Sequence, residues 1–365
     1  MPKSLKILIA CGGTGGHLFP GIAVGEALRA RGHEVLLLIS EKKVDSEASA
    51  KYRHLHFKTM PAVAKPRILS PHMLPFLWRL WNSVAQCKKV IGEFQADAVL
   101  GMGGFTSLPP VYAGHKLGIK TFIHESNARP GRANVLTSRF CTRVFLGMNA
   151  AKVFFSKRDT TTTGTPVRSE MIDLPNREVA AKLFGLDAKR LTIVVTGGSQ
   201  GAQRLNELSA QAAALLPSET QVLHIAGARD FTRVSEITQG RAGYKVLGFC
   251  DQMPAVYAIA DLVITRSGAS SLTEISIAGH PSILVPYPYA ADDHQTRNAE
   301  VFESAGAAKL AHECELDAAK LASLANFILH DLFTHKRMAK ASRALAVPDA
   351  ADQVCAAIEA TFSPT

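Results

Sequence analysis

Apolar runs of five or six residues alternate with a glycine-rich turn and a helix-like stretch near the start of the chain. Residues 5–10 form an apolar run interrupted by Lys6, residues 12–17 form the turn GGTGGH, and residues 19–31 have the pattern of a helix. Gly32 ends that helix, and a second apolar run follows at residues 34–39. The order strand, glycine turn, helix and strand predicts a βαβ unit of a parallel sheet.

The same pattern restarts beyond the middle of the chain. Residues 191–195 are apolar, residues 197–202 form a second glycine turn, GGSQGA, and a helix follows. Further strands are predicted in both halves, at residues 98–100, 121–123, 222–225, 244–247, 262–265 and 282–285. We therefore expect two doubly wound α/β domains, joined near the threonine-rich residues 160–166. A cleft between the carboxyl ends of their strands would suit group transfer between two substrates.

Length and composition agree with this organisation and exclude several classes of protein. The chain has 365 residues, which at about 150 residues per domain gives two or three domains. Hydrophobic residues make up 47% and charged residues 20%, so wholesale disorder is excluded. The six cysteines form no C-x-x-C pair, which argues against a zinc site or a disulfide framework and favours a reducing cytoplasm. No run of about 20 apolar residues is present, so we expect neither a membrane-spanning helix nor a signal peptide.

Charge is distributed unevenly along the chain. The net charge is +10, but residues 1–165 carry +14 and residues 166–365 carry −4. A basic first half suggests an anionic partner, which could be nucleic acid, an acidic membrane surface or a phosphorylated substrate. The charge alone does not distinguish these partners, because all three attract lysine and arginine through the same Coulombic field.

The turn GGTGGH has the composition of an anion site. Four glycines in six residues let the backbone approach a ligand closely, and the N–H groups that follow lie at a helix N-terminus. The spacing matches neither a dinucleotide fingerprint nor a G-x-x-x-x-G-K-[ST] phosphate loop. His17 ends the turn, where an imidazole can act as a general base near neutral pH. The alternative is a tight strand–helix turn without a ligand, with a histidine that has a structural role.

Two further strands of the basic half end in glycine or polar loops. GMGGF, at residues 101–105, follows the strand at 98–100, and HESN, at residues 124–127, follows the strand at 121–123. The carboxyl ends of parallel strands meet at one edge of a sheet. Three such loops at one edge predict a pyrophosphate site in the first half of the chain.

The second half contains two more helix N-termini that suit phosphates. GGSQGA adds Ser199 as a donor, and TRSGASSLTE, at residues 265–274, places a glycine and serines between a strand and a helix. Glu274 lies about one turn into that helix, where its carboxylate can accept both hydroxyls of a ribose. The alternative for Glu274 is an acid that complements the helix dipole. DDHQ-x-x-N, at residues 292–298, supplies amide and imidazole groups that suit sugar hydroxyls.

Residues 68–89 combine both tryptophans of the chain with basic side chains. Apolar residues recur there at helical spacing, and Arg67, Arg79, Lys88 and Lys89 lie in or beside the segment. Aromatic and basic residues together suit a membrane interface with anionic head groups. The alternative is an ordinary packing helix whose tryptophans face the core; the charge of the first half favours the membrane.

The motifs run in one order along most of the chain, and the ordered set resembles the MurG family of bacterial N-acetylglucosaminyltransferases, in glycosyltransferase family 28. The set comprises GGTGGH, GMGGF, HESN, TPVR at residues 165–168, GGSQGA, FCDQM at residues 249–253, RSGA with Glu274, and HQ-x-x-N. One motif alone has little specificity, whereas the ordered set from residue 12 to residue 298 is specific.

The resemblance implies a GT-B fold, in which two Rossmann-like doubly wound domains with parallel sheets face each other across a cleft. It implies that residues 1–164 bind the acceptor and the membrane, that residues 165–348 bind UDP-GlcNAc, and that a helix in residues 349–365 packs back on the first domain. The implied reaction is inverting transfer of GlcNAc from UDP-GlcNAc to the C4 hydroxyl of MurNAc in undecaprenyl-pyrophosphoryl-MurNAc-pentapeptide (lipid I). The products are lipid II and UDP.

The family's functional residues carry over to matching positions of this chain. The position of the proposed general base is His17. The positions implied to bind the acceptor diphosphate are Gly13, Gly103, Gly104 and His124. The positions implied to bind UDP-GlcNAc are Thr14, Gly15, Gly16, Asn127, Arg168, Ser199, Cys250, Ala269, Ser270, Ser271, Leu272, Thr273, Glu274 and Gln295. The positions implied to contact the membrane are Leu77, Trp78, Arg79, Trp81, Lys88 and Lys89.

The chain departs from the family pattern at a few of these motifs. His294 stands where the family has the first glutamine of a Gln-Gln pair, so the sugar hydroxyls must be recognised differently at that position. Smaller departures are Phe105 for tyrosine, Ser126 for glutamine and Thr165 for asparagine.

The resemblance implies an enzyme that needs no cofactor and no active-site metal. It implies a peripheral protein on the cytoplasmic face of the plasma membrane, active in peptidoglycan synthesis. The implied partners are UDP-GlcNAc, lipid I and an anionic membrane surface, with cell-wall and division proteins as candidates and no nucleic acid.

Three rival functions are weighed against this one. The first is another GT-B enzyme, either a soluble UDP-sugar glycosyltransferase or a UDP-GlcNAc epimerase; residues 68–89 and the first two glycine turns argue against it. The second is an NAD-dependent oxidoreductase, which the missing dinucleotide fingerprint disfavours. The third is a basic nucleic-acid-binding module, which the glycine loops in both halves disfavour.

Overall fold

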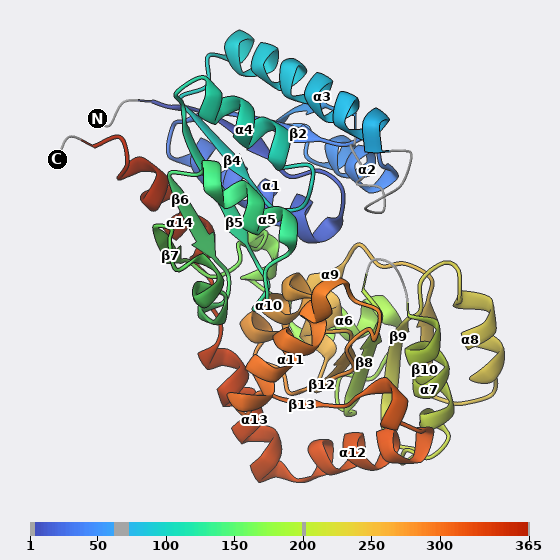
Figure 1. Ribbon diagram of the computed structural model, residues 1–365. Coiled ribbons are helices and arrows are strands. Elements are labelled where there is room, and N and C mark those ends of the chain that lie inside the picture. The colour runs from blue at the N-terminus through green and yellow to red at the C-terminus, as the bar shows by residue number, and fades with distance from the viewer. Residues whose placement is uncertain (1–3, 62–72, 199–201, 364–365) are drawn as a thin grey trace. The chain divides into compact units, whose positions relative to one another are not determined.

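The computed structural model describes residues 4–61, 73–198 and 202–363 of the chain (Figure 1). The chain forms two compact units, here named the first unit (Met1–Arg168 with Val347–Thr365) and the second unit (Ser169–Ala346). The observed boundary follows Arg168, whereas the sequence predicted it after residue 164. The difference has a physical reason, because the Arg168 guanidinium stacks on the ring of Phe19 in the first unit, 4.4 Å from its centroid.

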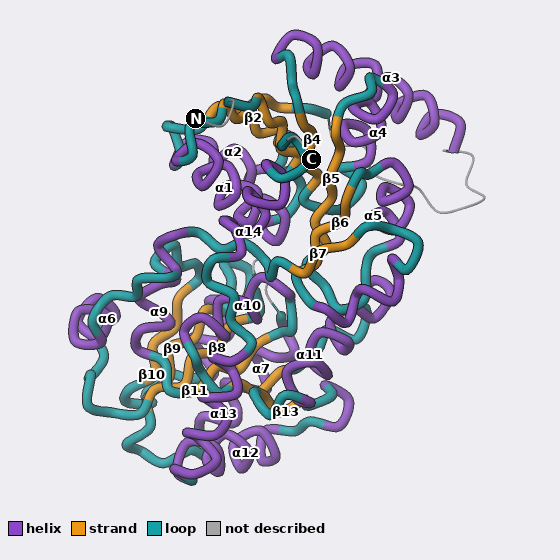
Figure 2. Tube along the Cα trace, turned by 90° about the vertical axis from the view of Figure 1, so that its left-hand side faces the viewer, coloured by secondary structure: helices purple, strands orange, loops and turns teal. Residues whose placement is uncertain are grey.

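Seven parallel strands form the sheet of the first unit, in the order β3-β2-β1-β4-β5-β6-β7. Figures 1 and 2 label β2, β4, β5, β6 and β7 of this sheet. The strands are β1 (Lys6–Ala10), β2 (Glu34–Ile39), β3 (His56–Thr59), β4 (Ala98–Gly101), β5 (Lys120–Glu125), β6 (Arg143–Leu146) and β7 (Thr160–Thr162). The strand order reverses direction between β1 and β4. In such sheets ligands bind outside the carboxyl ends of the strands at this switch point.

Helices cover both faces of this sheet. They are α1 (Gly15–Ala30), α2 (Lys43–Lys51), α3 (Met73–Phe94), α4 (Leu108–Lys116), α5 (Arg132–Thr137) and α14 (Ala350–Glu359), with 3-10 turns η1 (Ser138–Phe140) and η2 (Asn149–Phe155). Alternate β1 side chains point to opposite faces: Ile7 and Ile9 pack with α1 and α14, whereas Leu8 packs with α3 and α4. Because both faces are buried, β1 is a continuous apolar run from Ile7 to Ala10 and does not alternate with polar residues there.

The last helix, α14, belongs to the first unit although it follows the second unit along the chain. Cys355 of α14 is buried in the same core cluster as the α1 side chains. Arg31, just after α1, pairs with Asp352 at 2.7 Å and with Glu359 at 2.9 Å. Glu359 also lies 2.9 Å from His33 Nε2. These contacts fix the C-terminal helix beside α1.

The second unit has a six-stranded parallel sheet in the order β10-β9-β8-β11-β12-β13. Its strands are β8 (Thr192–Thr196), β9 (Gln221–Ile225), β10 (Tyr244–Leu247), β11 (Leu262–Thr265), β12 (Ser282–Leu284) and β13 (Ala308–Leu310). Its helices are α6 (Arg177–Phe184), α7 (Gln203–Ala213), α8 (Phe231–Ile237), α9 (Met253–Ile259), α10 (Ala269–Ala278), α11 (His294–Ser304), α12 (Ala318–His330) and α13 (Leu332–Ala344). Short 3-10 turns are η3 (Ser169–Met171), η4 (Ala291–Asp293) and η5 (Glu313–Glu315). On one face of this sheet, Ile193 and Val195 of β8 pack with α7 and α12.

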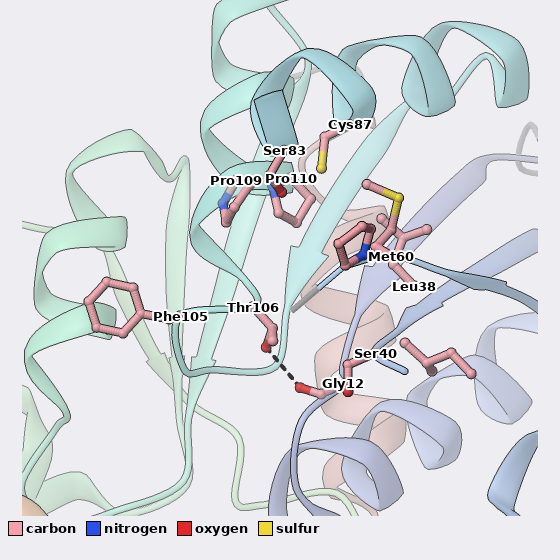
Figure 3. A pocket seen from close by; sticks show the side chains of 12 residues that line it. Gly12, Leu38, Ser40, Met60, Ser83, Cys87, Phe105, Thr106, Pro109 and Pro110 are labelled. Atoms are coloured by element: carbon pink, nitrogen blue, oxygen red, sulfur yellow. Dashed lines mark hydrogen bonds between the residues drawn. The ribbon is translucent and has the colours of Figure 1, made fainter. Parts of the chain in front are cut away.

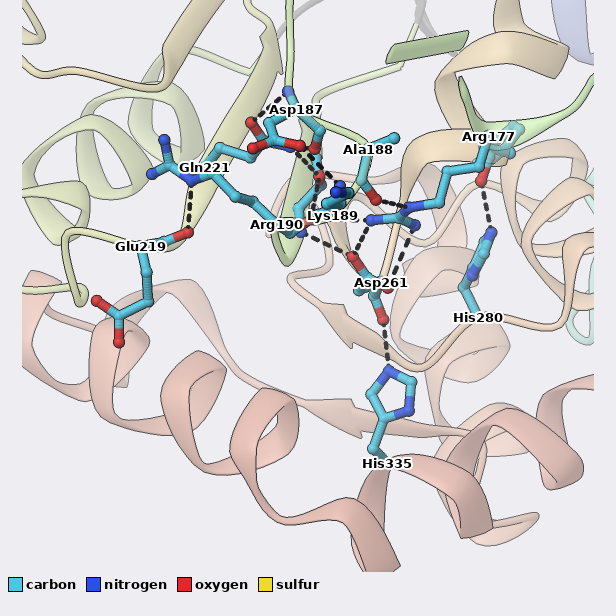
Figure 4. Close-up of polar contacts among 12 residues, drawn as sticks. Arg177, Asp187, Ala188, Lys189, Arg190, Glu219, Gln221, Asp261, His280 and His335 are labelled. Carbon is cyan, nitrogen blue, oxygen red and sulfur yellow. Dashed lines mark hydrogen bonds and ion pairs between the residues drawn. The ribbon is translucent and has the colours of Figure 1, made fainter. Parts of the chain in front are cut away.

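A partly buried ion pair ties several elements of the second unit together (Figure 4). Arg177 of α6 donates to both carboxylate oxygens of Asp261, at 2.7 and 3.3 Å. The same carboxylate accepts the backbone N–H of Thr192 at 2.8 Å. His335 of α13 donates to the Asp261 carbonyl at 2.9 Å. The pair therefore links α6 and α13 to the amino ends of β8 and β11, with charge-assisted hydrogen bonds on both partners.

The two parallel doubly wound sheets confirm the predicted α/β fold class. The apolar runs at residues 34–39 and 262–265 coincide with β2 and β11. The described residues contain no helix that is both long and apolar enough to cross a bilayer.

Candidate functional site

The glycine turn after β1 is pressed against the end of β2. A Cβ atom at Gly12 would lie 2.3 Å from the backbone nitrogen of Ser40, so only glycine fits there. Gly13 has φ +115°, in a region that favours glycine. Thr14 is the N-cap of α1. The turn therefore presents the first N–H groups of α1, starting at Gly15, at the carboxyl edge of the sheet.

A buried carboxylate that the sequence did not single out holds this turn. Asp45 of α2 accepts the backbone N–H of Gly13 at 2.9 Å and that of Ser40 at 2.8 Å, both through Oδ2. The Ser40 hydroxyl donates to the same oxygen. Lys42 Nζ donates to the Gly13 carbonyl at 2.7 Å. Side chains from the segment after β2 thus hold both the N–H and the carbonyl of Gly13.

His17 of α1 lies against the second glycine loop, which follows β4. A Cβ atom at Gly103 would lie 2.9 Å from His17 Cε1, and one at Gly104 would lie 3.2 Å from His17 Nε2. Both glycines also have positive φ, of 111° and 73°. GGTGGH and GMGGF therefore meet at one place in the first unit, at the ends of the neighbouring strands β1 and β4.

The N–H groups of the second glycine loop are used inside the protein. The Gly103 N–H donates to the Ser107 hydroxyl at 2.9 Å, and the Gly104 N–H donates to Asn134 Oδ1 at 3.0 Å. The Thr106 hydroxyl donates to the Gly12 carbonyl at 2.8 Å, which ties the two glycine loops together. The N–H groups of Gly103 and Gly104 are thus already hydrogen-bonded within the protein. These two glycines therefore contribute the space left by their missing side chains, and not hydrogen-bond donors.

Glu125, at the end of β5, orients the asparagine of the HESN motif. Glu125 Oε1 accepts the backbone N–H and the side-chain amide of Asn127, both at 2.9 Å. Its Oε2 accepts Asn134 Nδ2 at 2.8 Å. Burial raises the pKa of the Glu125 carboxyl, although these hydrogen bonds act in the opposite direction. Asn134 and Glu125 thus connect the Gly104 loop to Asn127.

His124 is a buried residue of β5 and not an exposed ligand-binding group. Its Nε2 donates to the Gly164 carbonyl at 2.9 Å, and its Nδ1 lies 3.3 Å from the Ser126 hydroxyl. Burial lowers the pKa of His124 to about 4, so the ring is neutral at pH 7. With both ring nitrogens engaged, His124 has no hydrogen bond to offer the acceptor diphosphate that the resemblance assigned to it.

A small cavity of about 30 Å³ lies beside Gly12, between α3 and the start of α4 (Figure 3). Its lining is mostly apolar and includes Leu38, Met60, Cys87 and Pro109. Burial raises the pKa of the Cys87 thiol to about 12, so this thiol stays protonated. The volume suits about one or two water molecules and is too small for a sugar or a diphosphate.

In the second unit, the N-terminus of α10 follows the end of β11. Gly268 is the N-cap, so the N–H groups of Ala269, Ser270 and Ser271 lie in the first turn of the helix. Leu272 is buried in the core, and the Thr273 hydroxyl donates to the Ala269 carbonyl at 2.9 Å. These two side chains therefore stabilise the helix, and the backbone N–H groups of its first turn stay the predicted anion site.

Glu274 lies in the next turn of α10 and is half-buried. The Tyr257 hydroxyl, from α9, donates to Glu274 Oε2 at 3.1 Å. Tyr257 is completely buried. The carboxylate thus has a partner on a neighbouring helix that the sequence did not reveal.

Two aspartates before α11 have backbone conformations that are uncommon for residues other than glycine. Asp292 has φ +53° and Asp293 has φ +55°. His294 begins α11, and its Nδ1 donates to the Ala291 carbonyl at 2.6 Å. In the neutral ring the other nitrogen, Nε2, is then a hydrogen-bond acceptor.

Gln295 is held from two sides. Its Oε1 accepts the Tyr287 N–H at 2.9 Å, and its backbone carbonyl accepts the Ser267 hydroxyl at 2.8 Å. Asn298 Nδ2 donates to the Ser267 carbonyl at 3.0 Å. Ser267 immediately precedes the α10 N-cap. Hydrogen bonds therefore join the DDHQ-x-x-N motif, at residues 292–298, to the N-terminus of α10.

The remaining nucleotide-binding candidates are placed less closely together. Cys250 is half-buried between β10 and α9, and burial raises the pKa of its thiol. Ser199 lies outside the described residues. Arg168 belongs to the first unit, where its Nη1 lies 3.4 Å from the Tyr52 hydroxyl. Its contact with a nucleotide stays a prediction.

The α3 helix exposes both tryptophans of the chain. Trp78 is 67% exposed and Trp81 is 68% exposed, and Arg79, Lys88 and Lys89 are exposed as well. The opposite side of the helix, with Val84, Cys87, Val90 and Ile91, packs on the sheet. The alternative in which the tryptophans face the core is therefore wrong. The side chain of Leu77, the other predicted membrane residue, lies outside the described residues.

A resident metal has no evident ligand set in the part of the chain that the structure describes. No cluster of three or more histidine, cysteine, aspartate or glutamate side chains there has the arrangement of a metal site.

Two family models match the two units. Residues 7–146 match the glycosyltransferase family 28 N-terminal domain, and residues 192–354 match the glycosyltransferase family 28 C-terminal domain. Glycine loops at the strand ends of two doubly wound units, together with these matches, define the class of protein as a glycosyltransferase.

Similar proteins narrow this class. A UDP-N-acetylglucosamine–N-acetylmuramyl-(pentapeptide) pyrophosphoryl-undecaprenol N-acetylglucosamine transferase of Halothermothrix orenii is 35% identical, covering 98% of this chain and 99% of the relative. A relative of the same name from Shewanella baltica is 37% identical, covering 97% of both chains. The crystal structure of Acinetobacter baumannii MurG superposes with a TM-score of 0.77 at 27% identity, covering 98% of this chain and 99% of that one. The chain belongs to this family of N-acetylglucosamine transferases within glycosyltransferase family 28.

Proposed function

We propose that this protein transfers GlcNAc from UDP-GlcNAc to the C4 hydroxyl of MurNAc in lipid I, giving lipid II and UDP. One observation carries the proposal: each unit has a helix N-terminus at the carboxyl edge of its sheet, and in the first unit a histidine lies beside it. A donor diphosphate and an acceptor diphosphate need two such anion sites, and the attacking hydroxyl needs a base. The family relatives carry the name of this reaction.

The second unit is proposed to bind the donor. The first turn of α10, from Ala269 to Ser271, directs its N–H groups to the diphosphate, and Glu274 accepts the ribose hydroxyls. His294 and Gln295 bind the hydroxyls of the GlcNAc ring. The backbone at Cys250 meets the uracil.

The first unit is proposed to bind the acceptor. The N–H groups of Gly13, Gly103 and Gly104 donate to protein side chains, and the space beside Gly103 and Gly104 holds the His17 imidazole. We therefore assign the acceptor diphosphate to the N-terminus of α1, at Gly15. Asn127, held by Glu125, contacts the transferred sugar.

The proposed chemistry is an in-line displacement at the anomeric carbon. His17 takes the proton of the C4 hydroxyl as the oxygen forms its bond to C1 of GlcNAc. The bond from C1 to the phosphate oxygen breaks, and its electron pair leaves with UDP, which inverts the anomeric centre. The α10 N-terminus stabilises the negative charge that develops on UDP, so no metal ion is required.

The proposed site of action is an anionic membrane surface, reached through α3. The exposed tryptophans suit the boundary between head groups and acyl chains, and Arg79, Lys88 and Lys89 suit anionic head groups. We place the protein as a peripheral enzyme on the cytoplasmic face of the plasma membrane in peptidoglycan synthesis. Cell-wall and division proteins are the candidate protein partners.

The deciding experiment is transfer of labelled GlcNAc from UDP-GlcNAc to a lipid I analogue by the purified protein, with and without EDTA. We expect a disaccharide lipid and an equal amount of UDP, in both conditions. Loss of transfer in EDTA that added Mg²⁺ restores would overturn the metal-free mechanism. Conversion of UDP-GlcNAc into its 2-epimer without labelling of the lipid would favour the rival epimerase.

A further inference from the structure

We propose that Tyr257 is a positioning residue for donor binding: its hydroxyl holds the Glu274 carboxylate in the orientation that accepts the ribose hydroxyls. The inference rests on the proposed function, in which Glu274 meets the ribose. Tyr257 makes no contact with the donor itself in this account, because its side chain is completely buried.

The geometry of the pair supports this role. Tyr257 lies on α9 and Glu274 on α10, and the phenol donates to Glu274 Oε2 at 3.1 Å. Glu274 is half-buried, so its carboxylate lies at the border between the Tyr257 hydroxyl and the exterior. A hydrogen bond to one carboxylate oxygen restricts the rotation of the carboxylate about its last torsion, which is otherwise broad.

The tyrosine is itself fixed at a second point. His280 Nε2 donates to the Tyr257 carbonyl at 2.7 Å. Burial lowers the pKa of His280 to about 4, so the ring is neutral at pH 7 and its single proton is committed to this bond. His280 follows Gly279, the C-cap of α10, whose φ is +76°. Tyr257 therefore joins α9 to the middle of α10 by its hydroxyl and to the end of α10 by its carbonyl.

The chemistry of ribose binding explains why such a support is useful. A glutamate that accepts hydrogen bonds from two vicinal hydroxyls must be ionised, and its carboxylate must be turned toward both hydroxyls. A phenol donor favours the ionised form, and a carboxylate that is already oriented loses less rotamer freedom when the nucleotide binds. Loss of the phenol should therefore weaken only the ribose-dependent part of donor affinity.

The test compares two ligands, UDP and 2′,3′-dideoxy-UDP, by isothermal titration calorimetry on the full chain. For Tyr257→Phe we expect UDP to bind about 3- to 10-fold more weakly, the range expected for one side chain that is no longer pre-ordered. The affinity for 2′,3′-dideoxy-UDP should change less than twofold, because this ligand has no ribose hydroxyls for Glu274. The donor KM should rise in proportion while kcat at saturating donor stays unchanged.

A matched control is available in the same unit. Tyr244 of β10 is half-buried, and its hydroxyl lies 2.7 Å from His224 Nδ1. Tyr244→Phe removes one hydrogen-bonded phenol in the same way and should leave the affinity ratio of the two ligands at the wild-type value. Glu274→Gln should lower UDP affinity selectively, and adding Tyr257→Phe to it should bring little further loss.

Each of the following results would overturn the inference. Equal weakening of both ligands by Tyr257→Phe would show that the tyrosine only supports packing, and unchanged UDP affinity would show that the hydrogen bond has no role. If Glu274→Gln itself failed to discriminate the ligands, the proposed ribose contact would fall together with the inference. A selective Glu274→Gln with a non-selective Tyr257→Phe would overturn the inference alone.

Discussion

The imidazole of His17 has room beside Gly103 and Gly104 only because these residues lack side chains. At the scale of single residues, the candidate site depends on such close contacts between side chain and backbone. It also depends on polar groups that are already hydrogen-bonded within the protein. Asp45, Ser107 and Asn134 accept the N–H groups of Gly13, Gly103 and Gly104, respectively.

Replacement of His17 tests the base. We expect His17→Ala to lower turnover by about 10²- to 10⁴-fold, the usual contribution of a general base, with little change in UDP affinity. Labelled GlcNAc transfer gives turnover, and calorimetry gives UDP affinity. The control is His54→Ala, which removes an exposed histidine paired with Glu26 in the same unit. Near-normal turnover of His17→Ala would remove His17 from the role of base.

His294 provides a second residue-scale prediction. Its Nδ1 proton is committed to the Ala291 carbonyl, so Nε2 can accept a hydroxyl proton from the donor sugar. His294→Gln restores an acceptor in amide form and should keep the donor KM within about threefold of wild type. His294→Phe removes the acceptor and should raise the donor KM by about 2- to 10-fold, the worth of one hydrogen bond. Steady-state kinetics with varied UDP-GlcNAc measure both, and equal KM values for the two variants would contradict the assignment.

The sequence identifies site residues that lie in motifs and misses those that support them from elsewhere. His17, Gly104 and Glu274 stand in glycine turns or at helix starts, so their position along the chain indicates a site. Asp45 and Tyr257 reach the site through folding, from positions 32 and 17 residues away from their partners. No local pattern marks a carboxylate or a phenol as a partner of a distant loop, so these supports appear only in the structure.

At the scale of elements, hydrophobic pattern predicts most strands, including the edge strand β10, but misses β3, β6, β7 and β13. β8 and β11 are buried on both faces and form apolar runs that are easily recognised. β3 (HFKT) and β7 (TTT), at the two edges of the first sheet, have mostly exposed or half-exposed polar side chains. Such strands pair through their backbone, and their side chains carry no hydrophobic signal. This explains why the sequence pattern did not predict β3 and β7; it does not explain β6, whose residues 144–146 are apolar and buried.

The prediction at the scale of elements concerns the binding of the α3 helix to anionic membranes. Each basic side chain near an anionic surface contributes about 1 kcal/mol, so loss of three should weaken binding by roughly 100-fold or more. We therefore expect the triple variant Arg79→Glu, Lys88→Glu, Lys89→Glu to bind phosphatidylglycerol-containing vesicles much more weakly in a flotation assay. These side chains are exposed, so folding should be retained.

The second unit offers a matched control for this variant. Lys336, Arg337 and Lys340 form a similar exposed basic group on α13. Reversal of these three charges changes the net charge of the chain by the same amount and should leave vesicle binding nearly unchanged. Equal effects of the two triple variants would show that net charge, and not α3, governs binding.

At the scale of the whole molecule, charge and protonation are divided between the units. Residues 1–165 carry a net charge of +14 and residues 166–365 carry −4, and the basic half is the one that exposes both tryptophans. Three histidines whose pKa is lowered by burial are unequally divided between the units: His124 lies in the first unit, whereas His224 and His280 lie in the second. Burial lowers the pKa of these residues to about 4, about 3 and about 4, respectively.

These histidines make stability fall as the solution is acidified. In the unfolded chain each has a pKa near 6.5, so below about pH 6.5 the unfolded state binds protons that the folded state does not. Their stabilising contribution is fully present above pH 6.5 and is lost as pH falls toward 4. Between about pH 6.5 and pH 4, each of these histidines lowers the free energy of unfolding by about 1.4 kcal/mol for every unit by which the pH falls. The second unit, with two of them, should therefore lose stability from this source about twice as steeply as the first.

Urea unfolding between pH 7 and pH 4, followed by hydrogen exchange in each unit, measures these slopes. His224→Gln should reduce the slope of the second unit by about 1.4 kcal/mol per pH unit, because one proton-linked group is removed, and should leave the first unit unchanged. Its lost contacts with Asn206 and Tyr244 lower stability at every pH, so the slope separates protonation from packing. An unchanged slope in His224→Gln would show that His224 titrates in the folded protein as it does in the unfolded chain.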